Sequence, residues 1–218
     1  GCSNTICHQV HVDTLPYVNF SNTTACLHDT TFFTNLSHGY SAAIISNQWD
    51  FGDGTTSTDI NPIHVYTSAG SFNVTLTVTD VNGCSNSTVH PVTVNPLPVA
   101  NFTSDDVCLG NISNFSSTST TSSGSIVSYQ WDFGDGSPMG SGNNVTHLYG
   151  DTGTYYVTHI VSTNNGCIDS IVLPVRINAN PLADFSADTA CAGTATIFTD
   201  LSDPIDGILN YWNWNFGD

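Results

Sequence analysis

The sequence contains no lysine and no glutamate, and Arg176 is the only basic residue other than the histidines. All 18 acidic residues are aspartates, and the formal net charge is -17 at pH 7. Proteins that bind nucleic acid or anionic lipid surfaces neutralise phosphate groups with Lys and Arg. We therefore expect no nucleic-acid partner.

Long apolar runs are also absent, so we expect no direct membrane insertion in this span. Ser, Thr, Asn and Gly fill most polar positions and β-branched residues are abundant, which favours strands and turns. A polar surface with few charges suits proteins outside the cell, and we expect a secreted or cell-surface location. Because neither an initiator Met nor a signal-like segment is present, we expect a window from a longer protein.

One short motif recurs along the chain. QWDFGDG begins at Gln48 and again at Gln130, and NWNFGD begins at Asn213, so the tryptophans are 82 and 83 residues apart. The motif contains the Asp-Phe-Gly triplet that holds magnesium in protein kinases, but a kinase also needs a phosphate-pairing lysine. We interpret the motif as part of a structural repeat.

The recurrence predicts the domain organisation. Residues 1–15 correspond to the last strand of a preceding repeat, 17–94 and 99–177 to complete repeats, and 182–218 to a truncated one. Prolines in the short joints between repeats favour extended backbone, so we expect the repeats to line up as a semi-rigid linear array.

Alternation of apolar and polar residues predicts strands with one buried face, most clearly from Phe72 to Val78. In the strand before the first turn, Ile45 is expected to share the inner face with the motif aromatics. The residues expected in the cores are Trp49, Phe51, Trp131, Phe133, Trp214 and Phe216. The residues expected in the tight turns that follow, where glycine supplies positive φ angles, are Asp50, Gly52, Asp53, Gly54, Asp132, Gly134, Asp135 and Gly136.

A His-x-Tyr sequence follows each complete motif. Tyr66 and Tyr149 precede a late strand, and we expect each hydroxyl to bond back to upstream backbone as a tyrosine corner. We interpret the neighbouring histidines as exposed or turn-capping side chains, and we prefer this interpretation to a role as metal ligands. His159 falls where Leu76 predicts an inward apolar side chain, so it is a buried hydrogen-bonded imidazole, a sign of a register shift, or a ligand.

Trp-Asp-Phe-Gly-Asp-Gly, followed by His-x-Tyr, Gly and an alternating strand ending in Val-Thr-Asp, resembles the polycystic kidney disease (PKD) domain. The resemblance implies an all-β fold of tandem immunoglobulin-like β-sandwiches. It also implies a spacer, adhesive or ligand-contacting role without catalytic activity. The extra cysteine in each repeat and the Asn-Gly-Cys turn resemble PKD arrays of large Bacteroidetes surface proteins, including gliding-motility adhesins. Similar domains occur in secreted proteases and chitinases.

Seven cysteines at recurring positions in a chain of secreted character predict disulfides. We pair Cys26 with Cys84 and Cys108 with Cys167, each closing a loop of nearly sixty residues. Cys191 then needs a partner beyond Asp218, and Cys2 one before Gly1. The cluster of Cys2, Cys7, His8 and His11 offers zinc-type ligands, but its spacing matches no common finger, and a disulfide from Cys2 to Cys7 is an alternative.

No cofactor is expected. The aspartates of the turns could attract calcium, but no glutamate closes a calcium loop, and turn capping is the default role of these side chains. Nothing indicates the cleft that a pair of glycosidase carboxylates requires. The candidate glycosylation positions, by an Asp-Ser/Thr pattern, are Thr14, Thr30, Ser170 and Thr189.

Repetition without a unique site favours a non-catalytic structural or adhesive role, as a stalk or surface filament on a bacterial cell. Its partners would be neighbouring copies, other surface proteins or glycans. The alternative is an accessory carbohydrate- or protein-binding module of a secreted hydrolase that uses exposed aromatics such as Tyr40, Tyr156 or Trp212. An enzyme is the third hypothesis, and we reject it because no His, Asp or Cys constellation survives comparison between the repeats.

Overall fold

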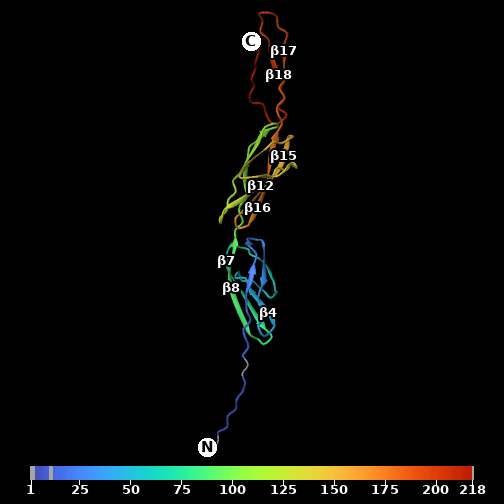
Figure 1. The fold of residues 1–218 in the computed structure, drawn as a ribbon. Coiled ribbons are helices and arrows are strands. Elements are labelled where there is room, and N and C mark those ends of the chain that lie inside the picture. Colours follow the sequence, from blue (N-terminus) through green and yellow to red (C-terminus); the bar gives the residue numbers. More distant parts are fainter. Residues whose placement is uncertain (1–2, 10–11, 218) are drawn as a thin grey trace. The chain divides into compact units, whose positions relative to one another are not determined.

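The computed structural model describes residues 3–9 and 12–217 (Figure 1). Strands are the regular elements throughout these residues, and none of them form a helix that is long and apolar enough to cross a membrane. Two compact units are present. The first comprises residues up to 98 with 121–125 and 163–167, and the second comprises the rest. The predicted class of all-β tandem sandwiches is confirmed.

The first repeat is a sandwich of two sheets. A five-stranded sheet has the order β2 (Ala25–Cys26), β8 (Ser85–Asn95), β7 (Gly70–Asp80), β4 (Ile44–Asp50), β5 (Thr56–Ser57). A three-stranded sheet has the order β1 (Phe20–Asn22), β3 (Thr30–Asn35), β6 (Ile63–Val65). β7 and β8 form a long antiparallel hairpin, and β2 joins the far end of β8 in parallel.

The core of this repeat lies between its two sheets. Val74, Leu76 and Val78 project from alternate positions of β7 and are fully buried, as a strand with one inner face requires. They pack with Trp49 and with Phe20 and Phe33 of the opposite sheet. Burying side chains of this size stabilises the sandwich by about 1.5–3 kcal/mol each.

At the start of β4, the side chains depart from simple alternation between the inner and outer faces. Ile44 lies opposite Asp80 and Ser46 lies opposite Thr79, so Ile45 is the extra residue of a β-bulge. Ile45 is 65 % exposed, whereas Ile44 packs against the core. The expectation that Ile45 points inward was wrong because the extra residue of the bulge interrupts the alternation of side chains between the two faces.

The second repeat has the same topology. Its five-stranded sheet has the order β10 (Val107–Cys108), β16 (Ile168–Asn178), β15 (Gly153–Thr163), β12 (Ile126–Asp132), β13 (Gly140–Ser141). Its three-stranded sheet has the order β14 (Asn144–His147), β11 (Ser113–Ser117), β9 (Phe102–Ser104). β15 repeats the burial pattern of β7 residue by residue, and β16 repeats that of β8.

Residues 182–217 form only one antiparallel pair, β17 (Phe185–Ala187) with β18 (Phe198–Asp200). Trp214 and Phe216 are 38 % and 61 % exposed, so the expectation that they fill a core was wrong. Among the described residues, no strands cover these rings as β7 and β8 cover Trp49 in the first repeat. Residues 3–9 and 12–15 form no strand in the described part of the chain, although the sequence pattern predicted one over residues 1–15.

Candidate functional site: the repeated Trp-Asp-Phe-Gly-Asp-Gly motif

The indole of each complete motif is a buried, hydrogen-bonded core group. Trp49 and Trp131 have no exposed surface. The Nε1–H of Trp49 donates to the carbonyl oxygen of Asp59 at 2.9 Å, and that of Trp131 donates to Gly142 at 2.9 Å. Because the polar edge of each ring is satisfied, the whole side chain can be buried without an unpaired donor.

The first aspartate of the motif caps the turn. Oδ1 of Asp50 accepts the N–H of Gly52 at 2.9 Å, and Oδ1 of Asp132 accepts that of Gly134 at 3.0 Å. Gly52 has a φ of 79°, and a Cβ there would lie 2.8 Å from the carbonyl oxygen of Asn73. Only glycine fits this position, so the first half of the motif is a backbone device.

The second aspartate binds a histidine across the turn. Oδ1 of Asp53 accepts the N–H and Oγ1–H of Thr55 at 3.0 and 2.6 Å, and Oδ2 accepts His64 Nε2 at 2.7 Å. Asp135 repeats this with the N–H of Ser137, at 3.0 Å, and with Nε2 of His147, at 2.6 Å.

These contacts lower the pKa of both carboxyl groups. Partial burial of Asp53 opposes the shift, but the hydrogen bonds from Thr55 and His64 and the attraction of His64 outweigh it. For Asp135 the equivalent contacts hold the pKa at about 2. Both aspartates are therefore ionised at neutral pH and are fully used within the turn.

Each of these histidines is packed as well as hydrogen-bonded. The ring of His64 stacks on Phe51 with centroids 4.2 Å apart, and its edge meets Tyr66 at 4.5 Å. His147 stacks on Phe133 at 4.0 Å in the same way. The sequence motif thus encodes one unit of aspartate, imidazole and two aromatic rings in each repeat.

The tyrosine hydroxyl closes this unit. Tyr66 is fully buried and its Oη–H donates to the carbonyl oxygen of Phe51 at 3.3 Å. Tyr149 makes the same bond to Phe133 at 3.2 Å. Burial and the nearby Asp53 carboxylate raise the pKa of Tyr66 well above its ordinary value, so the hydroxyl remains a neutral donor. In the first repeat, this hydrogen bond connects the segment between β6 and β7 to the end of β4.

The unit does not have the arrangement of a catalytic triad. A triad aspartate holds one imidazole nitrogen while the nucleophile bonds to the other. Here the Asp53 carboxylate and the Thr55 hydroxyl both approach Nε2 of His64, at 2.7 and 3.5 Å, so no proton relay connects them. Among residues 3–9 and 12–217 no group of three or more His, Cys, Asp or Glu side chains could hold a metal ion. The proposed zinc cluster includes Cys2 and His11, which lie outside the described residues.

His159 is a buried, hydrogen-bonded imidazole. Its Nδ1 donates to the carbonyl oxygen of Gln130 at 3.2 Å, and its Nε2 is hydrogen-bonded to the hydroxyl group of Ser117 at 2.9 Å. The ring also stacks on Trp131 with centroids 3.7 Å apart. Burial lowers the pKa of His159, partly opposed by the bond to Gln130, and the neutral ring suits a core position.

The two expected disulfides were wrong, and the structure contains a different disulfide. Cys26 is bonded to Cys167, while Cys84 and Cys108 are free. Cys26 lies opposite Asn95 at the end of β8, whereas Cys84 directly precedes the start of that strand. The 11 residues of β8 separate the two ends by about 35 Å. A disulfide needs Cα atoms within about 7 Å, so Cys26 cannot reach Cys84.

The same reasoning applies to the second expected pair. Cys108 lies opposite Asn178 at the end of β16, and Cys167 directly precedes the start of β16. The pairing depends on the end of the long strand near which each cysteine lies, and the sequence pattern alone did not locate these positions.

The candidate glycosylation positions are accessible. Thr14, Thr30, Ser170 and Thr189 all belong to exposed residues. Exposure is necessary for modification and does not by itself select these positions.

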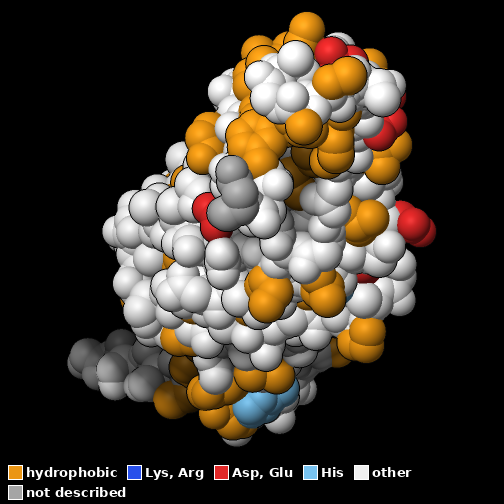
Figure 2. Space-filling view, turned by 90° about the horizontal axis from the view of Figure 1, so that it is seen from above, with side chains coloured by type: hydrophobic (Ala, Val, Ile, Leu, Met, Phe, Trp, Pro, Cys, Tyr) orange, Lys and Arg blue, Asp and Glu red, His pale blue; other side chains and the backbone are white. Residues whose placement is uncertain are grey.

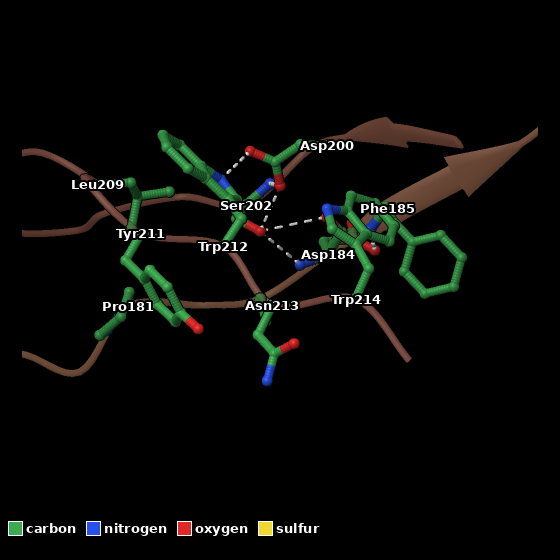
Figure 3. Close-up of a pocket in the computed structure, with 11 residues that line it drawn as sticks. Pro181, Asp184, Phe185, Asp200, Ser202, Leu209, Tyr211, Trp212, Asn213 and Trp214 are labelled. Atoms are coloured by element: carbon green, nitrogen blue, oxygen red, sulfur yellow. Dashed lines mark hydrogen bonds between the residues drawn. The ribbon is translucent and has the colours of Figure 1, made fainter. Parts of the chain in front are cut away.

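A pocket lies along the uncovered face of residues 181–214 (Figure 3). Trp212 Nε1 donates to Asp200 Oδ2 at 2.6 Å, and Ser202 Oγ donates to Asp200 Oδ1 at 2.6 Å. Trp214 and Phe185 form the apolar wall, with ring centroids 5.5 Å apart. The counterparts of Trp214 and Phe185 in the second repeat, Trp131 and Phe102, are buried core residues.

The folded repeats define a class of protein, namely tandem, disulfide-bonded immunoglobulin-like sandwiches built on an aromatic and aspartate motif. The sequence profile of the PKD domain matches residues 14–94 and 95–177, so the chain belongs to the PKD domain family. It is a non-catalytic region, because the part that matches is the PKD region alone.

Curated relatives match over short segments of their own length. Pre-pro-metalloprotease PrtV of Vibrio cholerae is 36% identical over 146 residues, covering 66% of this chain and 16% of the relative. A microbial collagenase of Vibrio alginolyticus is 42% identical over 67 residues, covering 31% and 8%. Collagenase ColQ1 of Bacillus cereus is 51% identical over 51 residues, covering 23% and 5%. The chain thus spans less than a fifth of each relative.

Two solved structures are similar to one repeat each. The PKD1 domain of Vibrio anguillarum Epp is 36% identical, with a TM-score of 0.36, and the match covers 38% of this chain and 96% of that domain. The PKD1 domain of the Vibrio cholerae metalloprotease PrtV is 38% identical, with a TM-score of 0.36, and the match covers 37% and 98%.

Proposed function

We propose that this chain is an extracellular accessory region of a hydrolase, in which PKD modules contact a protein substrate beside a separate catalytic domain. The relatives support this proposal, since they are named as a metalloprotease and collagenases and match only over their PKD segments. The disulfide between Cys26 and Cys167 supports an oxidising location outside the cell.

The proposal that this region is non-catalytic rests on one observation. Every reactive side chain of the motif makes contacts that stabilise the fold. The Asp53 carboxylate is bound by the hydroxyl and amide of Thr55 and by His64. The Asp135 carboxylate is bound by the amide of Ser137 and by His147. The imidazoles are stacked on Phe51 and Phe133. What the repeats leave free for a partner is their outer surface. On the face shown in Figure 2, hydrophobic side chains are scattered among other side chains and backbone, with a few aspartates between them.

Two exposed tyrosines are the best candidate contacts. Tyr40 is 66% exposed, and Tyr156 on β15 is 65% exposed and lies opposite Pro174 on the outer face. Tyrosine offers a large contact area at low entropic cost, with a hydroxyl for hydrogen bonding. Trp212 is a weaker candidate than the sequence suggested, because its position corresponds to that of Asn47, whose side chain bonds to Asn35 within the first repeat.

A sedimentation assay tests the proposal. The 218-residue chain is mixed with fibrillar collagen, with denatured collagen and with insoluble polysaccharides, and the depleted fraction is measured. We expect binding to a collagen form, weakened about tenfold or more by Tyr40→Ala or Tyr156→Ala, as for aromatic contacts that carry binding energy. Tyr211→Ala, which removes another exposed ring, is the matched control. Binding to polysaccharide alone, or equal binding by all variants, would contradict the proposal.

As a second candidate function, the chain would act as a spacer, forming a stalk or a surface filament of a bacterial cell that can also be adhesive. The observation that favours it is again the bond between Cys26 and Cys167, because these residues belong to successive matched segments, 14–94 and 95–177. A covalent link between successive repeats suits a region that carries tension. Electron micrographs of the whole protein test it: a beaded extension supports the spacer role, and one compact globule contradicts it.

A further inference from the structure

The cysteines fall into two classes by their place in the repeat. Strand cysteines end the short strand beside the last long strand, as Cys26 and Cys108 do, with Cys191 at the equivalent sequence position. Turn cysteines, Cys84 and Cys167, close the turn between the two long strands. The bond from Cys26 to Cys167 joins a strand cysteine to the turn cysteine of the next repeat along the chain.

The two strand cysteines have the same backbone setting. Cys26 is the parallel partner of Asn95, and the N–H of Leu27 donates to the carbonyl oxygen of Asn95 at 2.9 Å. Cys108 is the parallel partner of Asn178, and the N–H of Leu109 donates to Asn178 at 2.8 Å. The thiol of Cys108 is thus presented in the way that Cys26 presents its bonded sulfur.

An open hollow lies beside the free thiol of Cys108. Its lining includes Cys108, Asn178, Arg176 and Asp206. The sulfur of Cys167, which is bonded to Cys26, lies 4.0 Å from the carbonyl oxygen of Asn95, the counterpart of Asn178. The hollow beside Cys108 is thus also lined by Asn178, the counterpart of the residue that Cys167 contacts next to Cys26.

The two turn cysteines also match. The N–H of Asp80 donates to the carbonyl oxygen of Cys84 at 3.0 Å, and the N–H of Thr163 donates to that of Cys167 at 2.9 Å. The preceding glycines, Gly83 and Gly166, both have a φ of 82°. Cys84 is not needed inside its own sandwich, since its thiol is free and lies about 35 Å along β8 from Cys26.

We propose that Cys108 and Cys84 are inter-repeat cross-linking sites. Cys108 bonds to the turn cysteine of the repeat that follows, and Cys84 bonds to the strand cysteine of the repeat that precedes, so that one disulfide joins each successive pair. In forming a bond, two thiols lose two protons and two electrons to a disulfide donor, which is reduced to two thiols. This inference goes beyond the proposed function and does not depend on what the exposed tyrosines contact.

Disulfide mapping of the whole natural polypeptide tests the proposal. The protein is isolated without reductant, free thiols are blocked with N-ethylmaleimide, and the chain is cleaved at Asp because it lacks lysine. We expect non-reduced peptides that join Cys26 to Cys167, Cys108 to a turn cysteine and Cys84 to a strand cysteine. Alkylated Cys84 and Cys108, or a peptide joining Cys26 to Cys84, would overturn the proposal.

A second measurement separates cross-linking from chance oxidation. In the whole polypeptide, Cys108→Ser should release one alkylatable turn cysteine and leave the Cys26 to Cys167 peptide intact. Ser117→Ala, a change in the same repeat that removes no thiol, is the control and should release none. If Cys108→Ser frees no other thiol, Cys108 has no fixed partner and the proposal fails.

Discussion

The two complete repeats show how one backbone accommodates different cores. β7 and β15 bury the same positions, yet Leu76 of the first repeat corresponds to His159 of the second. Around His159, Ser117 supplies a hydroxyl and Gln130 a carbonyl oxygen. In the first repeat, the counterpart of Ser117 is Asn35, which donates instead to Asn47 at 2.7 Å. A buried imidazole is tolerated only where both of its nitrogens find partners.

The largest expected effect is loss of the shared indole. Trp49→Ala and Trp131→Ala should each lower the free energy of unfolding of the repeat concerned by about 3–5 kcal/mol, because each leaves a large cavity. We expect each variant to shift one unfolding transition in calorimetry and leave the other in place. Trp212→Ala, at a partly exposed ring, is the control and should shift neither. A parallel shift of both transitions would show that the repeats do not unfold separately.

The sequence predicted the features that depend on local pattern. Alternation from Phe72 to Val78 identified a strand and its inner face, and recurrence of the tryptophan motif identified the repeats. It did not predict the bulge at Ile45, because one extra residue leaves no mark in the composition. The bond from Cys26 to Cys167 was missed because cysteine spacing does not say at which end of β8 each thiol lies. The pairing of Asp53 with His64 was also missed, although Gly-Asp-Gly and His-x-Tyr recur together in both repeats.

Reciprocal substitution tests the comparison between Leu76 and His159. Leu76→His should destabilise the first repeat by about 2–4 kcal/mol, because an imidazole would lose apolar packing and meet Asn35 already bonded to Asn47. His159→Leu should change the stability of the second repeat by only about 1 kcal/mol in either direction, since packing is retained while Ser117 loses a partner. Urea unfolding measures both variants. Equal losses in the two repeats would contradict the role given to Ser117.

A smaller and equal effect is expected from the motif aspartates. Asp53→Asn and Asp135→Asn should each cost about 1–2 kcal/mol, because each weakens charge-assisted hydrogen bonds to the histidine and to the turn. The measurement is again urea unfolding at neutral pH. Asp106→Asn, an exposed position, is the control and should be close to neutral. Clearly unequal costs in the two repeats would mean that the Asp-His units are not equivalent.

The smallest expected effect is a difference in pH response. The pKa of His159 is lowered by burial, so this group binds a proton more readily in the unfolded chain than in the folded one. Stability of the second repeat should therefore decline as the pH falls below the ordinary histidine value of 6.5 toward the lower folded pKa. The low pKa of Asp135, about 2 instead of 3.8, acts in a separate window, where stability is lost only as the pH falls below 3.8.

Unfolding of the parent chain and of His159→Leu between pH 8 and pH 5 isolates this contribution. All other side chains are common to both proteins, so their contributions cancel in the difference. We expect the parent to lose more stability than the variant in the second repeat, with no difference in the first. Parallel curves would show that His159 is not held neutral by burial. The repeats would then differ in composition at this position without differing in their response to acid.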